Sequence, residues 1–142
     1  MIEEKIRLAK TKDAKEILKL FNSNKNLWGN NYINYGKEDI LDYLKAKINR
    51  MFVYEFNNKI KGVLLAQFWK KYVYIHTIVV DKKDQNHGIA TKLMNYLEHH
   101  AKSENKNLIE MDVETTNKKM RKFVKTRDYK HGNKFIYYLK EI

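Results

Sequence analysis

The stretch from Val79 to His100 reads VVDKKDQNHGIATKLMNYLEHH and joins two secondary-structure patterns through a short loop. Val79 and Val80 end a run of β-forming residues, and a polar loop then leads to Gly88. Apolar residues follow at a spacing of four: Ile89, Leu93, Leu97 and Ala101. This spacing predicts an amphipathic helix that runs to about Ser103. A strand, a tight loop and a helix N-terminus are therefore expected in direct succession.

Such a junction predicts an anion site. The first N–H groups of a helix have no partner within it, and the helix dipole adds a partial positive charge there. Gly88 would let the backbone approach a phosphate because it has no Cβ. Neither GxxxxGK[ST] nor GxGxxG is present. A helix start that merely needs a glycine is an equally weighted alternative.

Composition indicates one globular domain over residues 1–142. The chain is 43% apolar and contains no cysteine, so disulfides, thiolate metal sites and a cysteine nucleophile are excluded. No apolar run approaches the roughly 20 residues of a membrane span, and the N-terminus is too polar for a signal peptide. We therefore expect a cytoplasmic protein.

The formal net charge of +12 raises the question of a polyanionic partner. The lysines are scattered along the chain, arginine is scarce and proline is missing, which favours a compositional bias over a binding surface. Aromatic residues follow core-like patterns and no RNA-binding motif is present. We therefore do not expect nucleic acid as a partner.

The remaining patterns predict an α/β fold with a single mixed sheet in the order βααβββαβαβ. The expected strands are 5–9, 51–56, 59–69, 72–80, 108–114 and 135–139. One helix is expected to start after a cap at Thr11, and three more are expected at 37–49, 89–103 and 117–125. Asn57-Asn58 should turn a hairpin, and the strand–helix–strand unit from Tyr72 to Glu114 should be parallel and right-handed.

These residues resemble a known family. The sequence VDKKDQNHGIA is similar to the acyl-CoA-binding motif of the GNAT superfamily of N-acetyltransferases, a strand followed by (Arg/Gln)-x-x-Gly-x-(Gly/Ala) opening a helix. Gln85, Gly88 and Ala90 fill its three defining positions. The first strand and helix, the hairpin ending in K-I-x-G, and Asn117 followed by a helix also resemble the family, whose element order is the one derived above.

The resemblance implies acetyl-CoA as the acyl donor and a slot between splayed fourth and fifth strands. Its pyrophosphate would bind the loop and helix start, and its pantetheine would pair with the fourth strand like an added strand. Asn117 would hydrogen-bond the pantetheine arm or, with equal weight, serve as a helix N-cap. The implied cofactor-binding residues are Ile78, Val79, Val80, Gln85, Asn86, His87, Gly88, Ile89, Ala90, Thr91 and Asn117.

Acetyl transfer to an amine needs a base, an oxyanion donor and a proton for the leaving thiolate. Strand alternation places Tyr72, Tyr74, His76, Ile78 and Val80 on one face, where His76 alone titrates near neutrality. We predict His76 as the base, against a structural histidine as the alternative, with Glu110 and Asp112 as second choices. The Val80 N–H would stabilise the oxyanion.

The general acid is where the sequence departs from the family. Val124 stands where a tyrosine is usual, and Asp128 stands where the family has a glycine. Tyr129 is the predicted substitute, although a thiolate can also leave unassisted. A non-catalytic acyl-CoA-binding module of the same fold is the alternative function.

The acceptor side is less defined. Trp28, Tyr32 and Tyr35 either line an acceptor pocket or anchor a long loop. The sequence predicts a primary amine acceptor, no metal and no membrane, and it leaves a homodimer undecided.

Overall fold

The structure is a computed structural model that describes residues 1–24 and 35–142. The chain divides into two compact units, Met1–Asp112 and Val113–Ile142. In its described residues, the first unit contains the sheet, three α-helices and two short 3-10 helices. The second contains one helix and an extended C-terminal segment.

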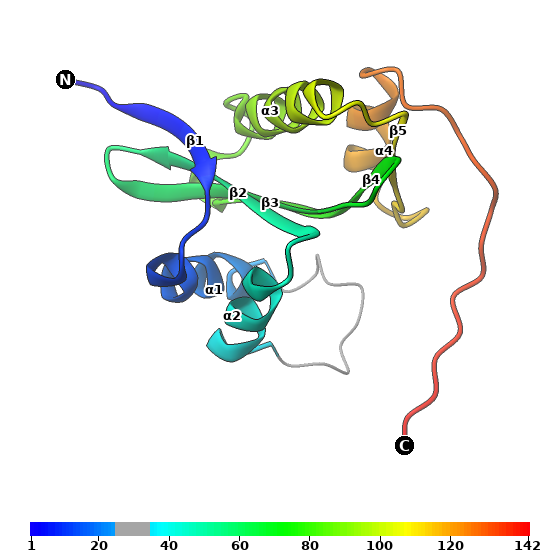
Figure 1. The fold of residues 1–142 in the computed structure, drawn as a ribbon, viewed down its shortest axis with the longest axis horizontal. Helices are drawn as coiled ribbons and strands as arrows, with labels where there is room; N and C mark the ends of the chain where they lie inside the picture. The colour runs from blue at the N-terminus through cyan, green and yellow to red at the C-terminus, as the bar shows by residue number, and fades with distance from the viewer. Residues whose placement is uncertain (25–34) are drawn as a thin grey trace. The chain divides into compact units, whose positions relative to one another are not determined.

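The first unit is built on a five-stranded mixed sheet in the order β1-β2-β3-β4-β5 (Figure 1). Its strands are β1 (Glu4–Leu8), β2 (Asn49–Phe56), β3 (Lys59–Phe68), β4 (Tyr72–Val80) and β5 (Leu108–Met111). Neighbours pair antiparallel from β1 to β4, whereas β4 and β5 are parallel. The predicted α/β class, the mixed sheet and the strand–helix–strand crossover are confirmed.

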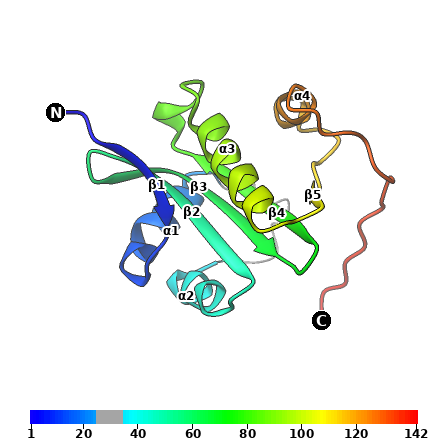
Figure 2. The same ribbon diagram turned by 45° about the horizontal axis from the view of Figure 1, so that its top comes forward.

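Helices cover both faces of this sheet. Helices α1 (Ala14–Asn22) and α2 (Lys37–Lys45) lie on one face, and α3 (Ile89–Ser103) lies on the other (Figures 1 and 2). The stripe predicted for α3 is buried, as are the inward residues of α1. Phe52 lies in the core between the sheet and α3. Its ring is 5.3 Å from the ring of Tyr96 and stacks on the ring of His100 at 5.7 Å.

Two local predictions on the α1–α2 side need correction. Helix α2 ends at Lys45, not Asn49, because Ala46 is extended and the Ile48 carbonyl accepts the Phe68 N–H at 2.7 Å, which already belongs to sheet pairing. Thr11 does not cap α1. Thr11 instead begins a short 3-10 helix, η1 (Thr11–Asp13), and Asp13 stands at the N-cap of α1 without a capping bond, because its carboxylate accepts the Lys10 N–H at 2.7 Å.

The Asn57-Asn58 hairpin is confirmed, since both residues have positive φ, 48° and 63°.

A cluster of ion pairs connects β1 to β2 and to the start of α1. The Arg7 guanidinium donates to Asp13 at 2.7 Å and to Glu55 at 2.6 Å, and both carboxylates are nearly buried.

The second unit contains α4 (Lys118–Lys125). The helix ends in a Schellman motif, in which the N–H groups of Asp128 and Tyr129 bond back to the Lys125 and Val124 carbonyls. Asp128 has φ of 66°, so it adopts the left-handed conformation although it is not glycine.

The predicted strand at 135–139 is wrong for this structure, which assigns no helix or strand to residues 129–142. A strand needs a neighbour for its N–H and C=O groups, and residues 113–142 contain no other strand. Within the described residues, no helix has both the length and the apolar character to cross a membrane.

The Arg7 cluster predicts acid-sensitive stability. Burial opposes ionisation of Asp13, but the Arg7 guanidinium and the Lys10 N–H outweigh it and lower its pKa; Arg7 likewise lowers the pKa of Glu55. Carboxylates with lowered native pKa values stabilise fully above their unfolded values of about 4, and this stability is lost as pH falls further. Asp13→Asn should cost about 2 to 4 kcal/mol at pH 7, and the cost should shrink below about pH 4.

Denaturant unfolding across this pH range measures the effect. Asp42→Asn is the matched control, because its ion pair with Lys45 is exposed and screened by solvent and should contribute little to stability. If the two substitutions lowered the free energy of unfolding equally, the Arg7 cluster would not stabilise the fold.

Candidate functional site

The sheet opens on one side of β4. Strand β5 pairs with β4 only from Tyr72 to Ile75, where Met111 is the last partner. Strand β4 continues to Val80. Within residues 1–24 and 35–112, no strand pairs with this second half of β4 on the β5 side. The predicted splay of the fourth and fifth strands therefore begins after Ile75.

The register of β4 decides which backbone groups face the opening. Asp81 donates its N–H to the Lys61 carbonyl at 2.9 Å, and the pairs Val79–Val63 and Val80–Gly62 follow in register. Hydrogen-bonded and non-bonded pairs alternate in an antiparallel ladder. Val79 therefore bonds to β3, whereas the backbone groups of Ile78 and Val80 point away from β3 toward the open edge.

The loop after β4 leads directly to an exposed helix start. Asn86 and Gly88 both have positive φ, 66° and 81°, which turns the chain into α3. The Lys92 N–H donates to the Gly88 carbonyl at 3.0 Å, so the N–H groups of residues 89–91 precede the first α-helical bond. Asn86, His87 and Gly88 are exposed, and a Cβ built on Gly88 meets nothing within 4 Å.

Four contacts hold this loop in place. The Gln85 side chain donates to the Val80 carbonyl at 3.2 Å, and Asp81 accepts the Lys83 N–H at 3.1 Å. Lys61 on β3 lies 3.3 Å from the Asp84 carboxylate and 4.0 Å from that of Asp81. Because Lys61 faces both acidic residues of the loop, it offsets negative charge that would otherwise oppose an anion.

Gly62 sets the distance between α3 and the sheet. A Cβ at Gly62 would lie 2.7 Å from Cγ2 of Ile89 and 3.2 Å from Cδ1 of Leu93. Gly62 also stands opposite Val80 in the ladder. The absence of a side chain here lets the start of α3 lie close against the end of β4.

His76 occupies a β-bulge, which corrects the predicted alternation. Leu65 pairs with Thr77 and Ala66 pairs with Ile75, so His76 is an extra residue without a partner on β3. Directly paired residues share a face. Ile78 and Val80 therefore lie on the α3 face with Gly62, whereas His76 contacts Tyr43 of α2 on the opposite face. The five residues do not share one face because the bulge interrupts the two-residue period.

Two aromatic rings surround His76. The Tyr74 ring is 4.8 Å away and the Tyr43 ring 6.1 Å, both edge-on. Partial burial lowers the pKa of His76, so the imidazole is neutral at pH 7 and can accept a proton. Tyr74 donates to Asp112 at 3.0 Å; burial and this carboxylate raise the pKa of Tyr74 to about 12.

Other predicted site residues fall into less direct positions. The side chains of Val79 and Ile89 are buried in the core. The backbone of Val79 bonds to β3 rather than facing the opening, which argues against its predicted cofactor contact, whereas the Ile89 N–H belongs to the exposed helix start. Asn117 caps α4 by accepting the Met120 N–H at 3.1 Å, and Tyr129 closes the Schellman motif. Trp28 and Tyr32 lie outside the described residues, and Tyr35 immediately precedes the Gly36 cap of α2.

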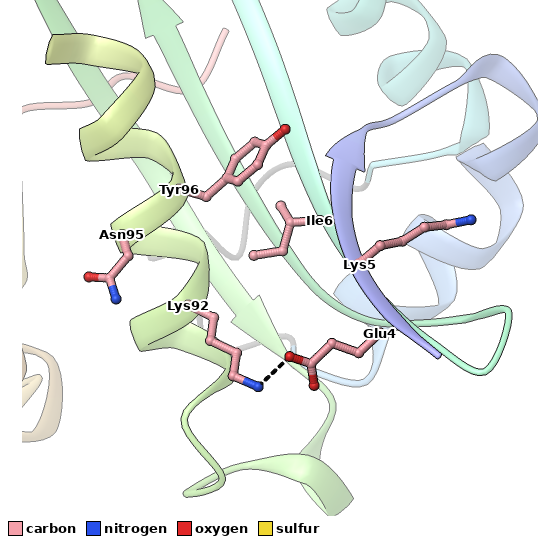
Figure 3. Close-up of a pocket in the computed structure, with 6 residues that line it drawn as sticks. All are labelled: Glu4, Lys5, Ile6, Lys92, Asn95 and Tyr96. Atoms are coloured by element: carbon pink, nitrogen blue, oxygen red, sulfur yellow. Dashed lines mark hydrogen bonds and ion pairs between the residues drawn. The ribbon is translucent and has the colours of Figure 1, made fainter. Parts of the chain in front are cut away.

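A separate groove of about 490 Å³ lies between β1 and α3 (Figure 3). It is lined by Glu4, Lys5, Ile6, Lys92, Asn95 and Tyr96. An ion pair of 2.6 Å joins Glu4 to Lys92 across it. The groove shares no residue with the β4 edge or with the loop, so it is not the site predicted from the sequence.

Comparison with known proteins identifies the family. The model of the acetyltransferase (GNAT) family matches residues 14–129. The chain belongs to the GNAT acetyltransferase family. It is therefore an enzyme of acyl transfer, and the open β4 edge, loop and α3 start correspond to the region through which the sequence motif predicted acyl-CoA binding.

Solved structures share the fold of this GNAT acetyltransferase. The aminoglycoside acetyltransferase meta-AAC0020 from an uncultured soil metagenomic sample, solved with sisomicin, has TM-score 0.80 and 17% identity, covering 98% of this chain and 96% of that one. A possible acetyltransferase from Clostridium difficile 630 has TM-score 0.82 and 19% identity, covering 98% of each. The aminoglycoside N-acetyltransferase AAC(6')-Iy with CoA has TM-score 0.79 and 15% identity, covering 100% and 97%.

At these identities the likeness shows the fold alone. No curated protein sequence matches the chain. Among residues 1–24 and 35–142 of this GNAT acetyltransferase, no group of three or more His, Asp or Glu side chains is arranged to hold a metal ion.

Sequence reasoning missed several residues that shape the site. Lys61, Gly62 and Tyr74 each act through a partner far along the chain: Asp84, Ile89 and Asp112. Of these three, only Gly62 had a sequence signal, the similarity of K-I-x-G to the family hairpin. That similarity marks the glycine but does not predict its contact with α3. The bulge at His76 has no signal in the strand pattern itself.

The contact at Gly62 predicts a stability effect. Gly62→Ala should destabilise the fold by about 1 to 3 kcal/mol because the new methyl group overlaps Ile89 at the start of α3. Gly132→Ala is the control, since its Cβ meets nothing within 4 Å and its cost should stay within about 0.5 kcal/mol. Thermal or urea unfolding measures both, and a neutral Gly62→Ala would show that α3 does not depend on this contact.

Proposed function

We propose that the protein is an N-acetyltransferase that moves an acetyl group from acetyl-CoA to a primary amine by direct attack. We also propose that residues 1–142 form its one catalytic domain. The observation that carries the proposal is the β4 edge that opens after Ile75 and leads without a break into the exposed start of α3.

The donor would bind along this path. The backbone groups of Ile78 offer strand-like hydrogen bonds to the amide groups of pantetheine, which leaves the N–H of Val80 for the thioester carbonyl. The pyrophosphate would bind the N–H groups of residues 86–91, where exposed amides and the helix dipole coincide. Gln85 would support donor binding indirectly. Its side chain donates to the Val80 carbonyl, so only the N–H of Val80 remains available to a ligand.

The chemistry follows from two groups on β4. A neutral amine attacks the thioester carbonyl carbon, the carbonyl oxygen becomes an oxyanion, and the Val80 N–H stabilises it. His76 accepts the proton that the amine loses, directly or through one water. The C–S bond then breaks, the amide forms, and CoA leaves as a thiolate that is protonated by Tyr129 or by solvent.

The acceptor would approach from the α1–α2 face of β4, where His76 and Tyr74 lie. Two of the similar structures are aminoglycoside acetyltransferases, so aminoglycosides belong in a test panel. The formal net charge of +12 repels polycations at long range, and a neutral or singly charged amine is the better expectation.

Donor binding is tested by thermal denaturation with acetyl-CoA, CoA, NAD and ATP in turn. Acetyl-CoA at 100 times its dissociation constant should add roughly 2.7 kcal/mol to the free energy of unfolding. Gly88→Asn should lower acetyl-CoA affinity roughly tenfold or more, because Asn tolerates positive φ but places a side chain in front of the amides.

Gly132→Asn is the control for this substitution, since both glycines have open space at Cβ but only Gly88 belongs to the loop. Unchanged acetyl-CoA affinity in Gly88→Asn, with the fold retained, would remove the α3 start from the donor site. Equal stabilisation by NAD or ATP would contradict acyl-CoA as the donor.

The role of His76 is tested by the pH profile of thiol release with an amine panel. The lowered pKa places the acidic limb of kcat/KM below about pH 6.5, and activity should fall as pH drops through it because the imidazole is then protonated. His76→Ala should lower kcat/KM roughly a hundredfold or more and remove that limb, with acetyl-CoA affinity unchanged.

His99→Ala is the control, an exposed histidine near the end of α3. An unchanged rate and pH profile in His76→Ala would exclude His76 as the base and direct attention to Asp112 and Glu110. Wild-type protein that binds acetyl-CoA but releases no thiol with any amine would favour the non-catalytic module instead.

A further inference from the structure

The loop between β4 and α3 carries two acidic residues beside the proposed anion site. Asp81 and Asp84 are half-buried, and the Asp84 carbonyl oxygen lies 3.3 Å from Nδ1 of His87, one residue before Gly88. A negative charge at this place opposes the approach of a phosphate group. The exposed amides therefore need a nearby cation if the loop is to bind a diphosphate.

One lysine of β3 supplies this cation. Lys61 Nζ lies 3.3 Å from the Asp84 carboxylate and 4.0 Å from that of Asp81. Over residues 1–24 and 35–142, no other lysine, arginine or histidine nitrogen lies within 4.0 Å of either carboxylate. Oδ2 of Asp84 is buried and accepts no hydrogen bond from these residues, so its contact with Lys61 is one of charge. Water screens such half-buried charges less than exposed ones.

The shape of the loop is held without the Asp84 carboxylate. The Asp81 N–H donates to the Lys61 carbonyl at 2.9 Å, and the Asp84 N–H donates to the Asp81 carbonyl at 2.8 Å. The Gln85 side chain donates to the Val80 carbonyl at 3.2 Å. None of these three bonds uses the side chain of Asp84. Its carboxylate therefore contributes charge to the loop more than it contributes shape.

Lys61 is fixed beside the helix start. Its neighbour Gly62 packs against Ile89, since a Cβ built on Gly62 would lie 2.7 Å from Cγ2 of Ile89. The charge of Asp84 is also felt at Tyr54 on β2. Burial, the hydrogen bond to Glu4 and the charge of Asp84 together raise the pKa of Tyr54 to about 12. Lys61 thus reduces the negative charge of the loop but does not cancel it.

We propose that Lys61 determines donor selectivity, because it counters Asp84 and Asp81 and so lets the loop accept a thioester that carries a diphosphate. The inference rests on the proposed donor site at residues 86–91. Asp84 competes with the donor for the same ammonium group. Loss of the Lys61 charge should therefore weaken donor binding, whereas loss of the Asp84 charge should strengthen it. An ion pair that merely anchored the loop would make both substitutions weaken binding.

Calorimetric titration of each full-length variant with acetyl-CoA tests these opposite signs. Lys61→Met should raise the dissociation constant roughly fivefold or more, whereas Lys61→Arg should keep it within about twofold of wild type. Asp84→Asn should lower the dissociation constant roughly threefold or more, since Lys61 is then free to face the phosphates. S-acetylpantetheine, a donor fragment without phosphate, should bind all of these variants equally, because the loop charges do not act on it.

Lys71→Met is the matched control, since it removes the same charge at the other end of β4. Lys71 precedes this strand and the loop follows it. A strand of nine residues spans roughly 30 Å, which exceeds the Debye length at physiological salt. Lys71→Met should therefore leave the acetyl-CoA dissociation constant unchanged. Thermal unfolding of each variant without ligand shows that the fold is retained.

Weaker acetyl-CoA binding by a folded Asp84→Asn variant would overturn the proposal, because the pair would then act as an anchor. An unchanged dissociation constant in Lys61→Met, or an equal loss for acetyl-CoA and S-acetylpantetheine, would overturn it too. If Lys61→Met does not fold, the sign of the Asp84→Asn effect decides. These results leave the donor site itself standing, whereas a wild-type protein that binds no acetyl-CoA would overturn the proposed function together with the role of Lys61.

Discussion

The register between β3 and β4 is the constraint on which the rest of the site depends. One hydrogen-bonded pair, Asp81 to Lys61, fixes the alternation, and this turns the backbone of Val80 toward the open edge and that of Val79 toward β3. A shift of the register by one residue would turn the backbone of Val79 to the open edge and that of Val80 to β3. The N–H proposed to meet the oxyanion would then be lost within the sheet.

The bulges refine this register. At His76 the extra residue reverses the faces of β4, so the imidazole faces α2 while Ile78 and Val80 face α3. At Lys61 the break in the β2–β3 ladder leaves a residue that faces the acidic side chains of the loop. The proposed proton acceptor thereby lies on the α1–α2 face of β4, whereas the backbone groups proposed to bind acyl-CoA lie in the plane of the sheet at its open edge.

Close packing completes the proposed anion site. Because Gly62 has no side chain, Ile89 and Leu93 approach the sheet and the start of α3 lies beside the end of β4. Gln85 and Lys61 then hold the loop, with the acidic side chains Asp81 and Asp84 turned toward a cation. The amides are therefore organised before any ligand binds, which lowers the entropic cost of binding.

The sequence by itself determined the mixed α/β class, the Asn57-Asn58 turn, the stripe of α3 and the glycine at 88, because each follows from the chain's own dihedral preferences or periodicity. Only the tertiary structure decided the length of α2, the face of His76 and the contact at Gly62. These depend on partners 20 or more residues away, such as Phe68 for Ile48 and Ile89 for Gly62. The fate of residues 135–139 belongs with them, since strand propensity alone supplies no neighbouring strand.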